Sequence, residues 1–149
     1  MGSLMQQLQT AILYGMTDNI TMEALLNQLR DSFGCDIIVY DRSYNVKCGA
    51  IHETAESAVR SIVQEGRLTD DEREGFETDL RGLVASRNRA GIFSVRYSTV
   101  TLAKIIKENS LEGILCCIFN AEAAEDDMLA FSTLLADTLT FMDIGTQDP

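Results

Sequence analysis

Apolar residues recur along this chain at two spacings, and each spacing predicts a different kind of element. A spacing of three or four residues puts apolar side chains on one face of a helix, whereas a spacing of two puts them on one face of a strand. Gly34 follows one helical stretch as a C-cap, and "TDDE" at 69–72 has the spacing of a capping box. The helical spacing predicts five helices, over residues 4–16, 21–33, 54–66, 69–84 and 120–142.

Shorter stretches rich in β-branched and aromatic residues predict strands. They cover residues 35–41, 46–51, 91–97, 101–108 and 111–119. The short turns "RSYN" and "ENS" make hairpins of the first two strands and of the last two. The element order ααββααβββα predicts an α+β fold with a five-stranded, mainly antiparallel sheet. We expect the terminal helices on one face of this sheet and the helical excursion between the two strand groups on the other.

The whole chain, residues 1–149, is predicted to form one domain. Its 149 residues suit a single domain of ordinary size, and no low-complexity linker interrupts them. Residues 1–3, Met-Gly-Ser, resemble a cloning remnant and are given no structural weight. Residues 143–149 are expected to form a tail.

The charge of the chain narrows the classes of partner. The net charge is −11, which repels phosphate backbones, so we expect no direct nucleic-acid binding by this chain. No uncharged apolar run reaches the roughly 18–20 residues of a membrane helix, and the first residues lack a signal-peptide pattern. The four cysteines show no CxxC spacing, which favours reduced thiols and a cytoplasmic location.

Catalytic motifs are missing from the sequence, so we expect no enzyme, metal or cofactor. The chain has no GxGxxG, Walker, HExxH or GxSxG pattern. Its single histidine, His52, would have to serve any Ser-His or Cys-His site, and its place between a strand and a helix favours a surface role. Arg81, Arg87 and Arg89 near a predicted helix end would bind an anion or complement the helix C-terminus.

Cys116 and Cys117 stand side by side in the apolar stretch "LEGILCCIF". Neighbours in a strand point to opposite faces, so Cys116 is expected to face with Ile114 and Cys117 with Leu115. Free cysteines pack as small hydrophobes, and burial makes their thiols inert. The pair therefore predicts a central strand covered on both sides.

One longer stretch resembles a known family. "TMEALLNQLRDSFGCDIIVYDRSYNVKCGA" is similar to the start of the GAF-like sensory domain of PucR/CdaR-type bacterial transcription regulators, in which a helix leads to a strand, an Asp-containing turn and a second strand. "LAKIIKENSLEGILCCIF" resembles the closing strand pair of that family, with Gly113 before the apolar strand. The resemblance covers roughly residues 20–142, and PAS domains share much of the same order.

The resemblance implies a ligand-sensing or signal-relaying module, normally joined to a helix-turn-helix output domain that this sequence lacks. The chain would bind a small, anionic metabolite where the helical excursion arches over the sheet. An arginine inside a strand, Arg96, is the leading candidate for holding the anion. The full set of candidate ligand-binding residues is Tyr40, Cys48, His52, Arg96, Tyr97 and Cys116.

The alternative function is a dimerisation or interaction domain without a small-molecule ligand. The last helix is broadly apolar, so one side can pack on the sheet and the rest on a partner helix. A wider buried face against the first two helices explains the same pattern. Under either function we expect a homodimer formed through the first and last helices.

Overall fold

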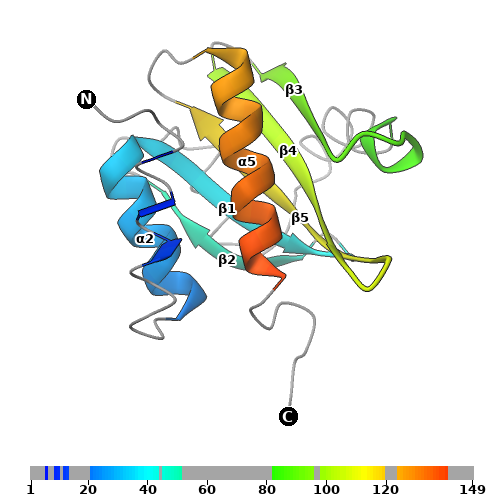
Figure 1. Cartoon of the computed structure of the whole chain (residues 1–149), viewed down its shortest axis with the longest axis horizontal. Helices are drawn as coiled ribbons and strands as arrows, with labels where there is room; N and C mark the ends of the chain where they lie inside the picture. The colour runs from blue at the N-terminus through cyan, green and yellow to red at the C-terminus, as the bar shows by residue number, and fades with distance from the viewer. Residues whose placement is uncertain are drawn as a thin grey trace.

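The computed structural model describes a sheet with helices packed on one of its faces (Figure 1). The described residues are 6, 9, 10, 12, 13, 21–43, 45–51, 82–95, 98–119 and 124–140. The elements that can be bounded are α2 (Met22–Phe33), β1 (Cys35–Asp41), β2 (Val46–Ala50), β3 (Ala90–Val95), β4 (Ser98–Lys107), β5 (Ser110–Phe119) and α5 (Glu125–Leu139).

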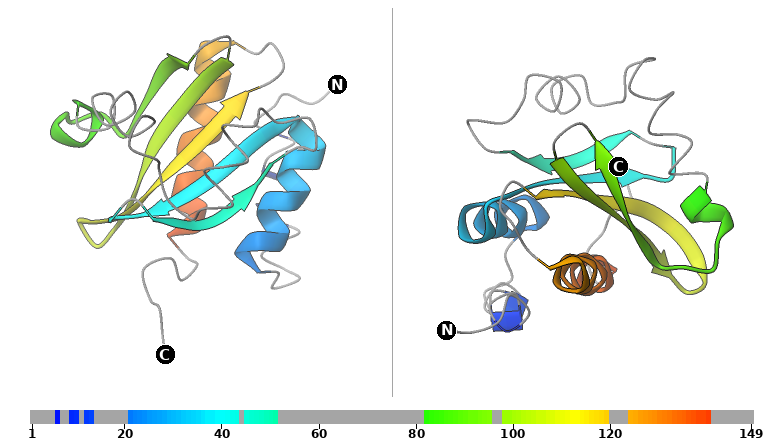
Figure 2. Two further views of the ribbon diagram at one scale, coloured as in Figure 1. Left: turned by 180° about the vertical axis from the view of Figure 1, so that it is seen from behind. Right: turned by 90° about the horizontal axis from the view of Figure 1, so that it is seen from above.

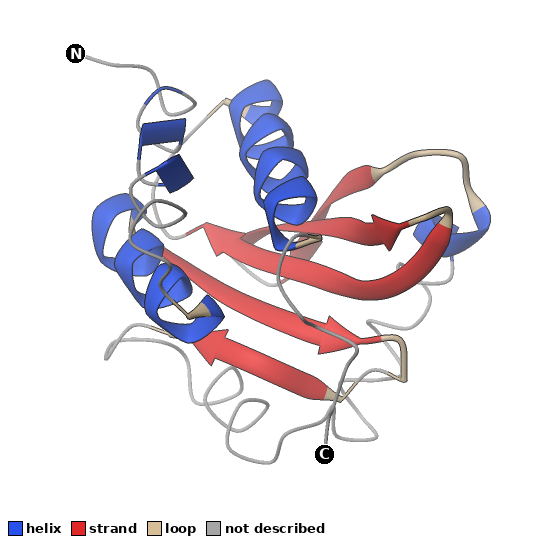
Figure 3. Ribbon diagram, turned by 60° about the horizontal axis from the view of Figure 1, so that its bottom comes forward, coloured by secondary structure: helices blue, strands red, loops and turns tan. Residues whose placement is uncertain are grey.

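The five strands form one sheet in the order β2-β1-β5-β4-β3, and every neighbouring pair is antiparallel (Figure 3). β5 lies in the middle, where β1 pairs with it on one side and β4 on the other. This confirms the predicted α+β fold with a five-stranded antiparallel sheet. β1 and β5, which are far apart in the sequence, are therefore neighbours at the centre of the sheet, where Ile37 pairs with Cys117.

Local chemistry fixes both ends of α2. The side chain of Thr21 accepts a hydrogen bond from the Ala24 N–H at 3.1 Å, which satisfies one of the free amides of the first turn. Gly34 has a φ of 67°, and its N–H donates to the Arg30 carbonyl, so it is the predicted C-cap. β1 then begins at the next residue.

Side-chain and backbone geometry also sets the two hairpin turns. The Asp41 carboxylate accepts from the backbone N–H groups of Ser43 and Asn45, at 2.8 and 3.0 Å, and so organises the turn between β1 and β2. Glu108 and Asn109 both have positive φ, 53° and 66°, which is the conformation of a tight turn that matches strand twist. The predicted β4–β5 hairpin is therefore confirmed.

The strand boundaries differ from the prediction at one place that matters for the candidate site. The predicted strand 91–97 ends at Val95 as β3, and Val95 already pairs with Ser98 of β4. Residues 96 and 97 lie outside the described residues, as do the predicted helix 54–66 and the capping box at 69–72. Of the predicted helix 69–84, residues 82–84 are described, and they are helical together with residue 85.

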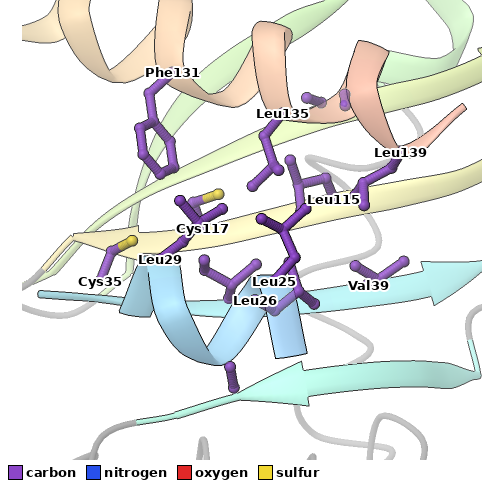
Figure 4. Packing of buried hydrophobic residues seen from close by; sticks show 14 of the residues in the cluster. Leu25, Leu26, Leu29, Cys35, Val39, Leu115, Cys117, Phe131, Leu135 and Leu139 are labelled. Atoms are coloured by element: carbon purple, nitrogen blue, oxygen red, sulfur yellow. The ribbon is translucent and has the colours of Figure 1, made fainter. Parts of the chain in front are cut away.

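α2 and α5 cover the same face of the sheet, as predicted for the terminal helices (Figure 2). We call this side the helix face. Its core is formed by apolar side chains of both helices and of β1, β4 and β5, ten of which are labelled in Figure 4. The fully buried members at the helix–sheet contact include Leu25, Leu29, Leu115, Cys117, Phe131 and Leu135.

The opposite side, which we call the second face, is also buried. Its core consists of Ile38, Tyr40, Leu83, Val100, Leu102, Ile114 and Cys116. Leu83, from the described helical residues 82–85, is the part of the predicted excursion that the structure places on this face. Cys116 and Cys117 lie on opposite faces and are both buried, so the prediction of a central strand covered on both sides is confirmed.

Candidate functional site

The second face carries several polar side chains within an otherwise apolar surface. Antiparallel pairing places residues on one face in rows across the sheet. One row runs from Lys104 through Ile114 to Tyr40, and the next from Leu102 through Cys116 to Ile38. An amine and a phenol therefore lie on either side of Ile114, with a thiol on the adjoining row.

Tyr40 and Cys116, two of the predicted site residues, are brought together here. Ile38 pairs with Cys116 and Tyr40 with Ile114, so Tyr40 and Cys116 are diagonal neighbours on β1 and β5. Both are nearly inaccessible, at 1% and 3% of their surface. They are therefore neighbouring members of the second-face core.

Cys48 is not part of that arrangement. It pairs with Val39, and both lie on the helix face, where Cys48 packs half-buried against the core. Burial raises the pKa of its thiol, and the nearby Glu23 carboxylate adds to this. The structure therefore separates Cys48 from Tyr40 and Cys116 by the thickness of the sheet, so the predicted grouping of the three is corrected.

The other three candidates, His52, Arg96 and Tyr97, lie outside the described residues. Alternation along the predicted strand 91–97 puts Arg96 on the same side as Ile92 and Ser94. Ile92 pairs with Thr101, whose hydroxyl is hydrogen-bonded to Ser132 of α5, so Ile92 lies on the helix face. The ligand-binding role of these residues stays a prediction.

Lys104 is a second-face residue that the sequence reasoning missed. It is only 8% exposed, and its Nζ donates to the carbonyls of Ser86, at 2.8 Å, and Val84, at 3.5 Å. A buried ammonium needs such partners, because leaving water without them is costly. The available signal was a lysine in the middle of an apolar strand, "LAKII", where charged residues are rarely found.

The thiol of Cys116 is chemically quiet. Burial raises its pKa, and Cys117 and the Asp36 carboxyl raise it further. Asp36 lies on the same face, opposite Ile118, and is itself 2% exposed. Because the thiolate is the nucleophile and the metal ligand, this environment suits packing or weak contact with a ligand and disfavours covalent chemistry.

The helix face has a buried polar cluster of its own. The hydroxyls of Thr101 in β4 and Ser132 in α5 are hydrogen-bonded to one another. Burial raises the pKa of the Cys117 thiol to about 12, while hydrogen bonds with Ser132 and Thr101 act in the opposite direction. The hydrogen bond links α5 to β4 and gives both buried hydroxyls a partner.

Of the three arginines near the end of the predicted fourth helix, Arg87 and Arg89 lie within the described residues and Arg81 does not. Arg89 forms an ion pair with Asp137 of α5, which gives it a structural partner in place of a bound anion.

No group of three or more His, Cys, Asp or Glu side chains suited to a metal ion occurs within the described part of the chain. Among the same residues, no helix is long and apolar enough to cross a membrane.

Comparisons with known proteins give likenesses of fold. No protein-family model matches the chain, and no curated protein matches it. An IclR transcriptional regulator from Alicyclobacillus acidocaldarius is 11% identical with a TM-score of 0.45, over 90% of this chain and 67% of that one. A sensory box sensor histidine kinase from Vibrio cholerae is 12% identical with a TM-score of 0.46, over 74% of this chain and 98% of that one.

A third solved structure is the cofactor-binding GAF domain of the nutrient sensor CodY from Clostridium difficile. It is 12% identical with a TM-score of 0.41, over 93% of this chain and 99% of that one. The structural neighbours thus include sensory and regulatory proteins. Membership of the PucR/CdaR family stays a prediction.

Proposed function

We propose that this chain is the sensory, signal-relaying domain of a bacterial transcription regulator of the PucR/CdaR type and that it binds a small molecule on its second face. The observation that carries the proposal is the composition of that face. Tyr40, Lys104 and Cys116 are set among apolar side chains of three central strands. Ligand sites are built in this way, from an apolar lining with a few placed polar groups.

The ligand class follows from the same residues. The apolar rows of Ile38, Leu102 and Ile114 suit a ligand with a hydrophobic body. Lys104 supplies a positive charge to this face. A small metabolite with an apolar part and an acidic group is the class that this combination favours. The domain is proposed to act in the cytoplasm and without catalysis.

The test is a thermal-shift screen of the chain against acidic metabolites at millimolar concentration. A ligand present at about 100 times its Kd stabilises a protein by about 2.7 kcal/mol, which for a domain of this size raises Tm by roughly 5–10 °C. Two matched variants then locate the site. Cys116→Leu fills the second face and should abolish the shift, whereas Cys48→Leu makes the same change on the helix face and should retain it.

Two outcomes would count against ligand binding at this face. One is a screen in which no acidic metabolite raises Tm. The other is a ligand whose shift is equal in both variants, because this would place the site away from Cys116.

A second candidate function, an interaction domain without a ligand, is favoured by the tight burial of the second face. Tyr40 and Cys116 are 1% and 3% exposed, as in a filled interior. Every residue of α5 from Met128 onward is buried or half-buried within the chain, which favours the wider buried face over a bare apolar helix surface. Leu13 of the first helical stretch is 67% exposed. We propose that it packs against a second copy of the chain.

Light scattering at high protein concentration tests the homodimer that both functions assume. The dimer is expected to show twice the 16.5 kDa mass of the chain, and Leu13→Asp is expected to reduce it to a monomer. A monomeric mass for the unmodified chain would contradict dimerisation. Dimers without any ligand response would favour the interaction domain.

A further inference from the structure

Residues 82–89, which we call the strap, join the two faces of the sheet. At one end, Leu83 packs into the second-face core and is 5% exposed. At the other end, Arg89 forms an ion pair with Asp137 of α5, a helix that packs on the helix face. The strap runs directly into β3, an edge strand of the sheet that contacts α5 (Figure 1).

Lys104 holds the strap to the sheet at two points. Its Nζ donates to the Ser86 and Val84 carbonyls, in the middle of the strap. Its backbone N–H donates to the Arg89 carbonyl at 2.8 Å, at the end of the strap. One residue of the candidate site therefore contacts both the part of the strap near Leu83 and the part that reaches α5.

Short-range hydrogen bonds connect the residues of the strap to one another. The Ser86 N–H is shared between the Gly82 and Leu83 carbonyls, both at 3.1 Å. The Ser86 hydroxyl donates to the Leu83 carbonyl at 2.7 Å and accepts from the Asn88 N–H at 3.2 Å. A displacement of Leu83 is thus passed to Ser86 and Asn88 through three hydrogen bonds.

The side chains of Phe93 and Leu83 leave little space beside Gly91, at the base of the strap. A Cβ placed on Gly91 would lie 3.0 Å from the Phe93 ring and 3.8 Å from the Leu83 Cδ1 atom. Phe93 itself packs against the second-face core. Leu83 and the Phe93 ring therefore both lie close to Gly91 and both pack in the second-face core, so we expect a shift of Leu83 to disturb Phe93.

We infer that the strap couples the second face to α5, so that a ligand which displaces Leu83 changes how α5 is held through Arg89 and Asp137. This inference rests on the proposed function for the identity of the ligand face, and it adds the route by which occupancy reaches a terminal helix. The final link is a surface ion pair, with side chains 41% and 49% exposed. Such pairs are weak, so the coupling is limited to about fivefold in equilibrium.

Hydrogen exchange on the ligand-free chain tests the coupling, with exchange rates in α5 expressed relative to those in α2. Leu83→Ala is expected to raise the relative exchange of residues 134–140 by about two- to fivefold. Asp137→Asn should raise it by itself, and adding Leu83→Ala to Asp137→Asn should give no further increase. Asp127→Asn, which neutralises an exposed acid in the first turn of the same helix, serves as the control and should leave the Leu83→Ala effect intact.

If Leu83→Ala unfolds the chain, Leu83→Val provides the same comparison with a smaller cavity. The inference is overturned if the strap exchanges faster in the Leu83 variant while residues 134–140 stay unchanged relative to α2. It is also overturned if the effects of Leu83→Ala and Asp137→Asn simply add. Because no ligand is used, a failed metabolite screen and a failed coupling experiment are separate results.

Discussion

The two faces of the sheet use the same strands but differ in chemistry. The helix face is filled by leucines and by a chain of edge-to-face aromatic contacts, in which Phe131 lies 5.2 Å from Phe33 and 5.6 Å from Phe119. The second face has a similarly dry core but includes a phenol, a carboxyl and an ammonium, on Tyr40, Asp36 and Lys104. Among the described residues, the buried polar groups where α5 meets the sheet are hydroxyls and thiols, whereas those of the second face include a carboxyl and an ammonium.

The largest expected difference between the faces is in the cost of removing an aromatic ring. Phe131→Ala should lower the free energy of unfolding by about 3–5 kcal/mol, because the ring is fully buried between α5 and the sheet. Phe93→Ala on the second face should cost less than half as much, since Phe93 is only partly buried. Urea unfolding with unchanged m-values measures both, and equal losses would remove the distinction.

Alkaline pH tests the burial of both faces through their thiols. The pKa of Cys117 is about 12 in the fold against an ordinary value of 9.0, so the thiol favours the folded state below pH 9.0 and that contribution falls as the pH rises towards 12. The loss is about 1.4 kcal/mol per pH unit for one such thiol. Cys117→Ala should therefore show a shallower decline in unfolding free energy than the parent above pH 9.0.

Cys116→Ala is the matched variant on the second face. Burial raises the pKa of Cys116 in the same direction, so a dry second face predicts an equally shallow decline. A decline as steep as that of the parent would show that water reaches Cys116 and that the second face is the more open of the two.

The next effect concerns the polar cluster of the helix face. Ser132→Ala should cost about 1–3 kcal/mol, because the hydroxyl of Thr101 loses its buried partner. Adding Thr101→Val should recover part of this loss, since both polar groups are then gone. Thermal unfolding of the two single variants and the double variant measures the coupling. Additive losses would mean that the two hydroxyls do not depend on one another.

Much of the fold was predictable because it is determined locally. Gly34 ends α2 through its own positive φ, and the alternation at Cys116 and Cys117 follows from strand geometry. The strand order was not predictable in this way, because β1 pairs with β5 across a long separation in sequence. No local pattern records which distant strand will be the neighbour.

The candidate site was only partly accessible to sequence reasoning for the same reason. The face of Cys48 depends on the pairing of β1 with β2, whose register shifts between Val39 and Tyr40. Alternation within one strand cannot show such a shift. Lys104 acquires its role from carbonyls on residues 84 and 86, in a segment whose position no motif in the sequence specifies.

The smallest expected change in stability comes from a residue in the β4–β5 turn, which belongs to neither face of the sheet. Glu108 adopts a φ of 53° in the β4–β5 turn, a conformation that is costly for a residue with a Cβ atom. Glu108→Gly should raise the free energy of unfolding by about 0.5–1 kcal/mol, because glycine adopts this φ without strain. Equilibrium unfolding measures the gain, and a lower stability would show that the glutamate side chain has a compensating contact.

The adjacent thiols of Cys116 and Cys117 form a natural pair of reporters. They share one stretch of backbone, so fraying of β5 exposes both to a thiol reagent at once, whereas lifting of one covering layer exposes only one of them. The ratio of their modification rates, measured by mass spectrometry on a single peptide, therefore reports which face of the sheet opens more readily. A bound effector that seals the second face would slow Cys116 alone and leave its neighbour as the reference.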